Sequence, residues 1–166
     1  MTTLNLYPNV PCAYPNTLTQ DTVATSVGNT PTVLAVFQNN SSVPNLRGLM
    51  QRFSFTPFNP SNDTLLHIHM IGFGTPTGGT FTPVGGYSQF NINTTATDYT
   101  GGTVALTMFD YVVLGNKTQP SSLSSLDAAS LGLELPVGQT FAIVAHTEAV
   151  GETVSLAWTV NWLEKD

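Results

Sequence analysis

T-V-S-L-A-W-T-V-N-W-L, residues 153–163, is the stretch of the sequence that decides the fold. Every second position is apolar, and these positions are Val154, Leu156, Trp158, Val160 and Trp162. The positions between them are small or polar. A period of two over this length predicts a β-strand with one buried face, because a helix would spread the same residues around its circumference. Both tryptophans of the chain lie on the apolar face, so the strand is expected to cross a sizeable core in which each indole N–H needs a partner.

Further β-type runs precede this strand and are separated by turns rich in Gly, Pro and Asn. These runs cover residues 32–38, 49–55, 64–73, 88–93, 103–114 and 140–148. Alternation in the second run places four residues on one face, namely Leu49, Gln51, Phe53 and Phe55. The short connection at 149–152 predicts a hairpin between 140–148 and the final strand, and residues 121–130 allow a single helical turn.

About eight strands without a convincing helix predict an all-β protein, and more specifically an antiparallel, jelly-roll-like β-sandwich. An immunoglobulin-like sandwich is the alternative, although the chain has no cysteine pair to support it. The predicted division is an extended, Pro-rich N-terminal arm over residues 1–31 and the β-sandwich domain over residues 32–166. Prolines in the first segment remove backbone donors and disfavour packed elements.

The predicted arm carries apolar side chains that could dock on a neighbouring subunit. They are Leu4, Leu6, Tyr7, Val10 and Tyr14. The other interpretation places this segment along its own domain, since chain termini are often loose unless they are tied down.

Charge is scarce: four basic and ten acidic residues give a net charge of −6, and charged residues make up 8% of the chain. An average soluble protein has about 25%. The shortage of Lys and Arg argues against binding to nucleic acid, whose affinity depends on phosphate neutralisation, and against an anionic membrane surface. Cys12 is the only cysteine, which excludes an internal disulfide. The N-terminus lacks the basic and apolar regions of a secretory signal, so synthesis in a cytoplasm is expected.

Three histidines are the candidate metal ligands. His67 and His69 occupy alternate positions of one predicted strand, and His146 lies on another with Glu148 two residues further on. Such spacing resembles cupin sites, but no glutamate follows His69 at the distance that a cupin pattern requires. Half-exposed strand histidines are the preferred interpretation, and we predict no metal and no cofactor.

Catalytic signals are weak. The chain has no G-x-S-x-G elbow and no phosphate-binding glycine motif. Asp110 and Glu148 are the best candidates for a glycosidase carboxylate pair, yet neither has a distinctive context. We therefore predict no catalytic residues and no enzymatic activity. Tyr87 and Tyr99 could form a ligand-facing loop that stacks on sugar rings, or could pack within their loops.

Three segments taken together resemble small structural proteins of tailed-bacteriophage virions, of the capsid decoration (cement) or head-fibre type. They are T-G-G-T-F-T-P-V at 77–84, L-G-L-E-L-P-V-G-Q-T-F-A-I at 131–143 and S-L-A-W-T-V-N-W-L-E-K-D at 155–166. The resemblance covers residues 49–166. It implies a β-sandwich or jelly roll that binds a capsid lattice as a dimer or trimer through an arm, with no catalytic residues.

The expected function is therefore a non-enzymatic virion structural protein that decorates or cements a bacteriophage capsid. Its expected partners are the major capsid protein or other virion proteins and further copies of itself, as a homotrimer, with no nucleic acid and no membrane. The expected location is the virion, after synthesis in the host cytoplasm. The alternative is a receptor- or carbohydrate-binding tip or fibre domain of a virion.

Overall fold

A computed structural model describes residues 14–58, 62–85, 88–113, 115, 124–127 and 134–165. No helix occurs among these residues, and the strands form antiparallel sheets. The predicted all-β class is confirmed.

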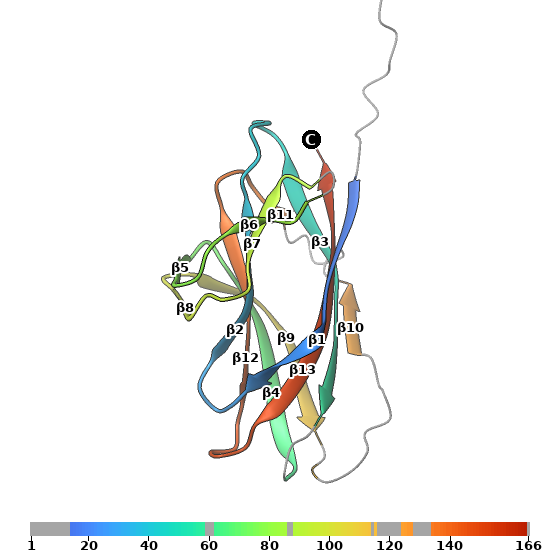
Figure 1. Cartoon of the computed structure of the whole chain (residues 1–166), viewed down its shortest axis with the longest axis vertical. Coiled ribbons are helices and arrows are strands. Elements are labelled where there is room, and N and C mark those ends of the chain that lie inside the picture. Colours follow the sequence, from blue (N-terminus) through green and yellow to red (C-terminus); the bar gives the residue numbers. More distant parts are fainter. Residues whose placement is uncertain are drawn as a thin grey trace, which may run out of the picture.

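The first sheet has the strand order β1-β13-β3-β10, and β11 also pairs with β3. The bounds are β1 (Tyr14–Val27), β3 (Arg47–Phe58), β10 (Ser124–Asp127), β11 (Glu134–Leu135) and β13 (Val154–Lys165). This sheet forms the right-hand layer in Figure 1.

The second sheet has the order β6-β7-β2-β12-β4-β9 and forms the left-hand layer in Figure 1. The bounds are β2 (Thr32–Asn39), β4 (Thr64–Gly72), β6 (Thr82–Pro83), β7 (Phe90–Asn93), β9 (Thr103–Val113) and β12 (Thr140–Thr147). A small ribbon of β5 (Thr75–Thr77) and β8 (Asp98–Thr100) projects on the side away from the first sheet.

The core lies between the two sheets and contains the apolar face of β13. Trp158 and Trp162 are 2% and 1% exposed, so both indoles lie on the buried side, as the alternation predicts. Trp162 meets Phe37 of the second sheet edge-on, with ring centroids 5.5 Å apart. The strand identified in the sequence therefore makes an aromatic contact with the opposite sheet.

A buried carboxylate closes the end of β13. Glu164 is 1% exposed, and its Oε1 accepts a hydrogen bond of 2.9 Å from the indole N–H of Trp162. The Ser88 hydroxyl and the Gln89 backbone N–H donate to the same carboxylate. The charge is thus hydrogen-bonded, as burial requires, and it fixes the segment before β7 to the first sheet.

The predicted hairpin between residues 140–148 and the final strand is wrong. β12 pairs with β2 and β4 in the second sheet, whereas β13 pairs with β1 and β3 in the first. The connection between them crosses from one layer to the other. The apolar faces of the two strands therefore meet across the core. In a hairpin, the two strands would instead lie next to each other in one sheet.

The alternation predicted for residues 49–55 is wrong in its first half. The β3–β13 register shifts between Asn161 and Trp162, and this shift leaves Gln51 as an extra residue. A bulge reverses the alternation beyond it. Met50, rather than Leu49 and Gln51, is therefore buried together with Phe53 and Phe55.

Two further segments differ from the prediction. Residues 14–27 form β1 and pair with β13, so this part of the segment predicted as an arm belongs to the first sheet. Residues 124–127 form β10 against β3 rather than part of a helical turn. In each case, pairing with a distant strand decided the conformation of a segment with weak local preference.

Candidate metal centre

Strict alternation on β4 directs two of the histidines outward. Leu66, Ile68 and Met70 are buried against the first sheet, while His67 and His69 are half-buried on the opposite face. β12 follows the same rule, because Ile143 and Ala145 join the core and His146 is half-buried. The three imidazoles therefore lie on the outer face of the second sheet.

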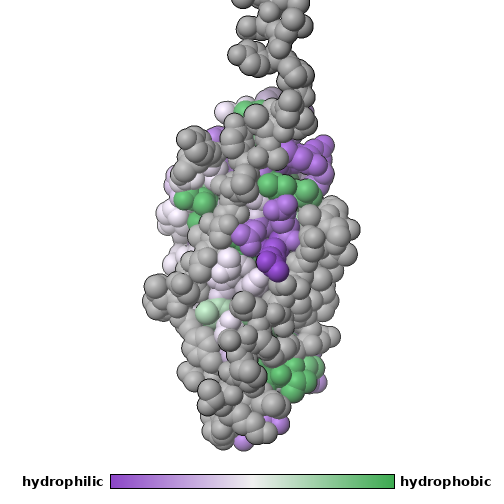
Figure 2. Space-filling model, turned by 90° about the vertical axis from the view of Figure 1, so that its right-hand side faces the viewer, coloured by the Kyte–Doolittle hydropathy of each residue, from purple (hydrophilic) through white to green (hydrophobic). Residues whose placement is uncertain are grey.

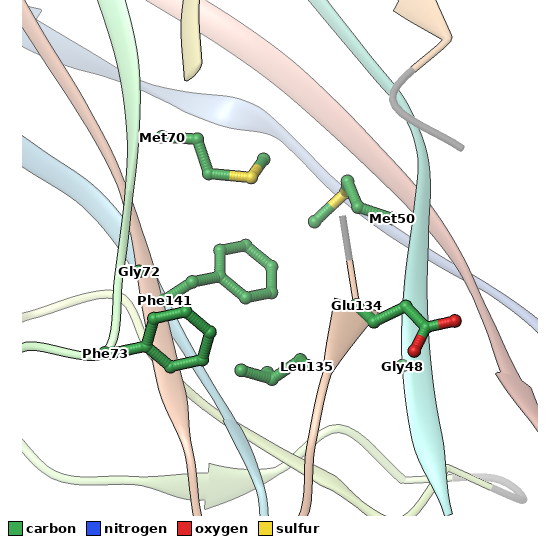
Figure 3. A pocket seen from close by; sticks show the side chains of 8 residues that line it. All are labelled: Gly48, Met50, Met70, Gly72, Phe73, Glu134, Leu135 and Phe141. Atoms are coloured by element: carbon green, nitrogen blue, oxygen red, sulfur yellow. The ribbon is translucent and has the colours of Figure 1, made fainter. Parts of the chain in front are cut away.

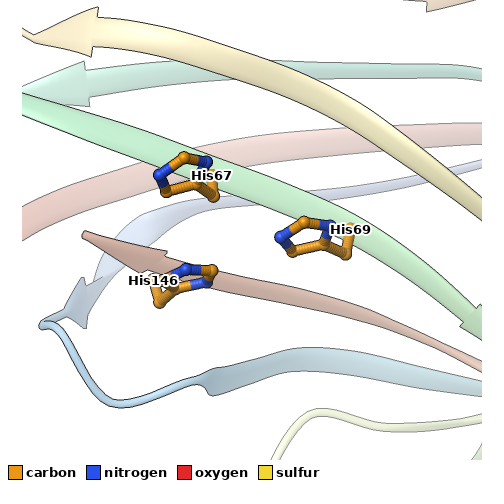
Figure 4. Close-up of side chains that lie close together, drawn as sticks. All are labelled: His67, His69 and His146. Carbon is orange, nitrogen blue, oxygen red and sulfur yellow. The ribbon is translucent and has the colours of Figure 1, made fainter. Parts of the chain in front are cut away.

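Strand register brings the three histidines together. In the antiparallel β4–β12 pair, His146 lies directly opposite His67, and Val144 lies opposite His69. The ring centroid of His146 lies 4.8 Å from that of His67 and 5.4 Å from that of His69, and the rings are nearly parallel. One nitrogen from each ring lies within 4.8 Å of the other two. Figure 4 shows the three rings gathered over the two strands, and we call them the histidine cluster.

The borders of the histidine cluster are irregular on one side and apolar on the other. Towards β9, the β4 register shifts between Ile68 and His69, the kind of bulge that often re-aims side chains near functional sites. Asp110 is the register partner of His67 on that strand. On the other side, Val144 belongs to an apolar cluster formed under the β5–β8 ribbon. Glu148 is exposed beyond the end of β12 and is not one of the three clustered groups.

The placement of the histidine cluster does not fit a cupin-like site within the sandwich. Met70, next to His69, faces the interior, and the histidines face away from it. The chemistry available is that of three imidazole nitrogens at a half-exposed surface, a donor set suited to Zn, Cu, Ni or Fe. The sequence identifies the three histidines as candidate ligands. It does not show that His146 lies opposite His67, because the two residues are far apart in the chain.

A second candidate is an apolar cleft between the two sheets, with about 370 Å³ of empty space, part of it open to solvent. It is lined by Gly48, Met50, Met70, Gly72, Phe73, Glu134, Leu135 and Phe141 (Figure 3). The Glu134 carboxylate at this cleft forms an ion pair of 2.9 Å with Arg47. The cleft therefore offers apolar contact and, among its lining residues, a single charged group that already has a partner.

Of the two interpretations of Tyr99, a ligand-facing loop and packing within its loop, the burial of its side chain favours packing. Tyr99 is 8% exposed, and its hydroxyl accepts a hydrogen bond from the Gly74 N–H and lies 3.0 Å from the Thr140 carbonyl. The ring packs over the outer face of the second sheet, where it has little surface left for a sugar. Tyr87, its predicted partner, lies outside the described residues.

Most of the predicted arm residues also lie outside the described part of the chain; these are Leu4, Leu6, Tyr7 and Val10. Tyr14 begins β1 and is in register with Glu164. For the predicted carboxylate pair, the structure gives Glu148 as exposed and places Asp110 within β9.

No protein-family model matches this chain, and no curated protein matches it. In the described residues, the structure has no helix of the length and apolarity needed to cross a membrane.

Proposed function

We infer that the chain is a non-enzymatic structural protein of a bacteriophage virion, built on a jelly roll and binding a capsid surface as a homotrimer. The observation that carries this proposal is the order in which the chain visits the two sheets. β1, β3, β10 and β13 belong to the first sheet, while β2, β4, β9 and β12 belong to the second.

This connectivity supports a jelly roll more than a simple sandwich of hairpins. The chain changes sheets at each step from β1 to β4, between β9 and β10, between β11 and β12, and again between β12 and β13. The eight main strands pair as two sets of four, in the orders β1-β13-β3-β10 and β2-β12-β4-β9. Double-sheet jelly rolls of eight strands occur in viral capsid proteins, in lectins and in cupins.

The core and the position of the histidine cluster favour a viral structural protein over a cupin. The core between the sheets is filled by aromatic and aliphatic side chains, which suits a rigid shell component. A cupin would place its metal ligands inside, whereas the histidine cluster lies outside. In the view of Figure 2, the coloured residues on the first-sheet side include both hydrophilic and hydrophobic groups.

The alternative, a receptor- or carbohydrate-binding tip domain, depended on Tyr87, Tyr99 and the Gly-rich loops. Burial of Tyr99 removes one of these two residues from the ligand surface. A glycan array tests this alternative directly, and a sub-millimolar hit would favour it over capsid decoration.

The test of the proposal is reconstitution on phage particles that lack this protein. Purified chain is added, the particles are sedimented, and bound protein is located by electron microscopy. We expect stoichiometric, ordered decoration, and a trimeric mass for the free protein by light scattering. Absence of bound chain on every particle tested would overturn the proposal.

The contribution of the arm needs a shorter deletion than residues 1–31. Removing 1–31 would take away β1, which pairs with β13 along its length, so a folding defect would obscure the result. Removing residues 1–13 keeps β1. We expect this variant to retain its circular dichroism and thermal unfolding but to bind particles at least about tenfold more weakly, a loss of about 1.4 kcal/mol. The matched control, Val150→Ser in the exposed β12–β13 connection, should bind as the parent does.

A further inference from the structure

We propose that His67, His69 and His146 form a binding site for a borderline divalent transition-metal ion such as Zn²⁺ on the outer face of the second sheet. The site goes beyond the proposed structural function and does not depend on it. It is carried by geometry: two adjacent strands bring three imidazoles, each half-buried, to within 4.8 Å nitrogen to nitrogen.

The first argument is concentration of ligands. The chain has three histidines in 166 residues, and all three lie in this one cluster. Histidine is the commonest metal ligand in proteins, and three imidazoles with an open fourth position form the ligand set of known zinc sites.

The second argument is the rigidity of the support. His67 and His69 are held by β4, a strand with its opposite face buried in the core, and His146 is held by the neighbouring strand β12. Sites on paired strands hold their ligands more precisely than sites on loops. The direct register of His67 with His146, and the diagonal position of His69, make a triangle of ligands on one surface.

The third argument is the small adjustment that binding requires. Zn–N bonds of about 2.0–2.1 Å place the nitrogens of a tetrahedral site roughly 3.3 Å apart. The nitrogens now lie within 4.8 Å of one another, and the rings are nearly parallel, with interplanar angles of 10–20°. Rotation of half-buried rings about their side-chain torsions closes this difference while the strands remain in place.

The half-exposed position leaves room for a further ligand. A tetrahedral ion held by three imidazoles keeps its fourth position for water or for a group from another molecule. Asp110 is the register partner of His67 on the neighbouring strand β9. Metal binding requires neutral imidazoles, so the ion binds in competition with protons.

The test uses the full-length chain purified without a histidine tag and treated with a chelator. Zn²⁺ is titrated by calorimetry, and Co²⁺ is added separately as a spectroscopic probe. We expect one Zn²⁺ per chain, and Co²⁺ absorption in the visible range of the intensity that four- or five-coordinate sites give. Absence of stoichiometric Zn²⁺ binding, or a Co²⁺ spectrum identical to that of the hydrated ion, would overturn the proposal.

Variants locate the site. His67→Gln, His69→Gln and His146→Gln should each weaken Zn²⁺ binding by at least about 100-fold, the upper end of what loss of even an outer-shell partner costs. Leu65→Gln, on the same face of β4 but outside the histidine cluster, is the matched control and should leave the affinity unchanged. Cys12→Ser excludes the chain's single thiol as the ligand. Retention of Zn²⁺ binding in the triple histidine variant would show that the ion binds elsewhere, and circular dichroism of each variant confirms that it is folded.

Discussion

The inner face of β13 and the outer face of β4 and β12 are built on the same two-residue period but serve different purposes. On β13, the period places Trp158 and Trp162 in the core, where each is at most 2% exposed. On β4 and β12, the same period places the histidine cluster where it remains half-buried. The inner face determines whether the chain folds, and the outer face determines what the folded chain can bind. The predictions below test this separation.

The largest effect is expected from the inner face. Trp162→Ala removes an indole that contacts Phe37 and Phe90, and we expect it to lower the free energy of unfolding by about 3–5 kcal/mol. Urea denaturation measures this change. Ser155→Ala, on the outer side of the same strand, is the control and should change stability by less than about 0.5 kcal/mol. Similar losses in the two variants would contradict the inner role of the tryptophan face.

Zn²⁺ should connect the outer face to stability. An ion that binds only the folded chain stabilises it by about 2.7 kcal/mol at a free concentration of one hundred times Kd. For a protein of this size the melting temperature should rise by roughly 5–10 °C. His146→Gln should reduce the rise to roughly 2 °C or less without lowering the melting temperature of the metal-free protein. An equal rise in that variant would place the effect outside the histidine cluster.

The buried carboxylate at the end of β13 should have an intermediate effect. Glu164→Ala leaves the Trp162 indole and the Gln89 N–H without their acceptor, and we expect a loss of about 2–3 kcal/mol in chemical denaturation. Glu148→Ala, at an exposed glutamate, is the matched control and should change stability little. Equal effects would mean that loss of negative charge, rather than loss of buried hydrogen bonds, sets the result.

The smallest effect is expected from the histidines in the absence of metal. Each His→Gln substitution at a half-buried position should change the free energy of unfolding by less than about 0.5 kcal/mol. Thermal unfolding in the presence of a chelator measures this. A loss of several kcal/mol would instead assign the histidines to the structural core and would remove the contrast between the two faces.

Pairing between distant strands decided the features that the local sequence pattern did not predict. Local alternation predicted that Trp158 and Trp162 share a face and that His67 and His69 share another, because the direction of a side chain on a strand depends only on its position in the two-residue period. The bulge at Gln51 interrupts that period. It arises in the pairing of β3 with β13, and no local sequence signal predicts it. The hairpin prediction for β12 and β13 failed for a similar reason, since a short connection can join strands of one sheet or of two.

The sequence by itself determined the all-β class, the buried face of β13 and the shared face of His67 and His69 on their strand. Only the tertiary structure decided that β1 completes the first sheet, that Tyr99 is buried over the second, and that His146 lies opposite His67. The physical reason is the range of the interactions. Burial of alternate side chains is a property of neighbouring residues, whereas register and sheet order depend on how distant strands together fill one core.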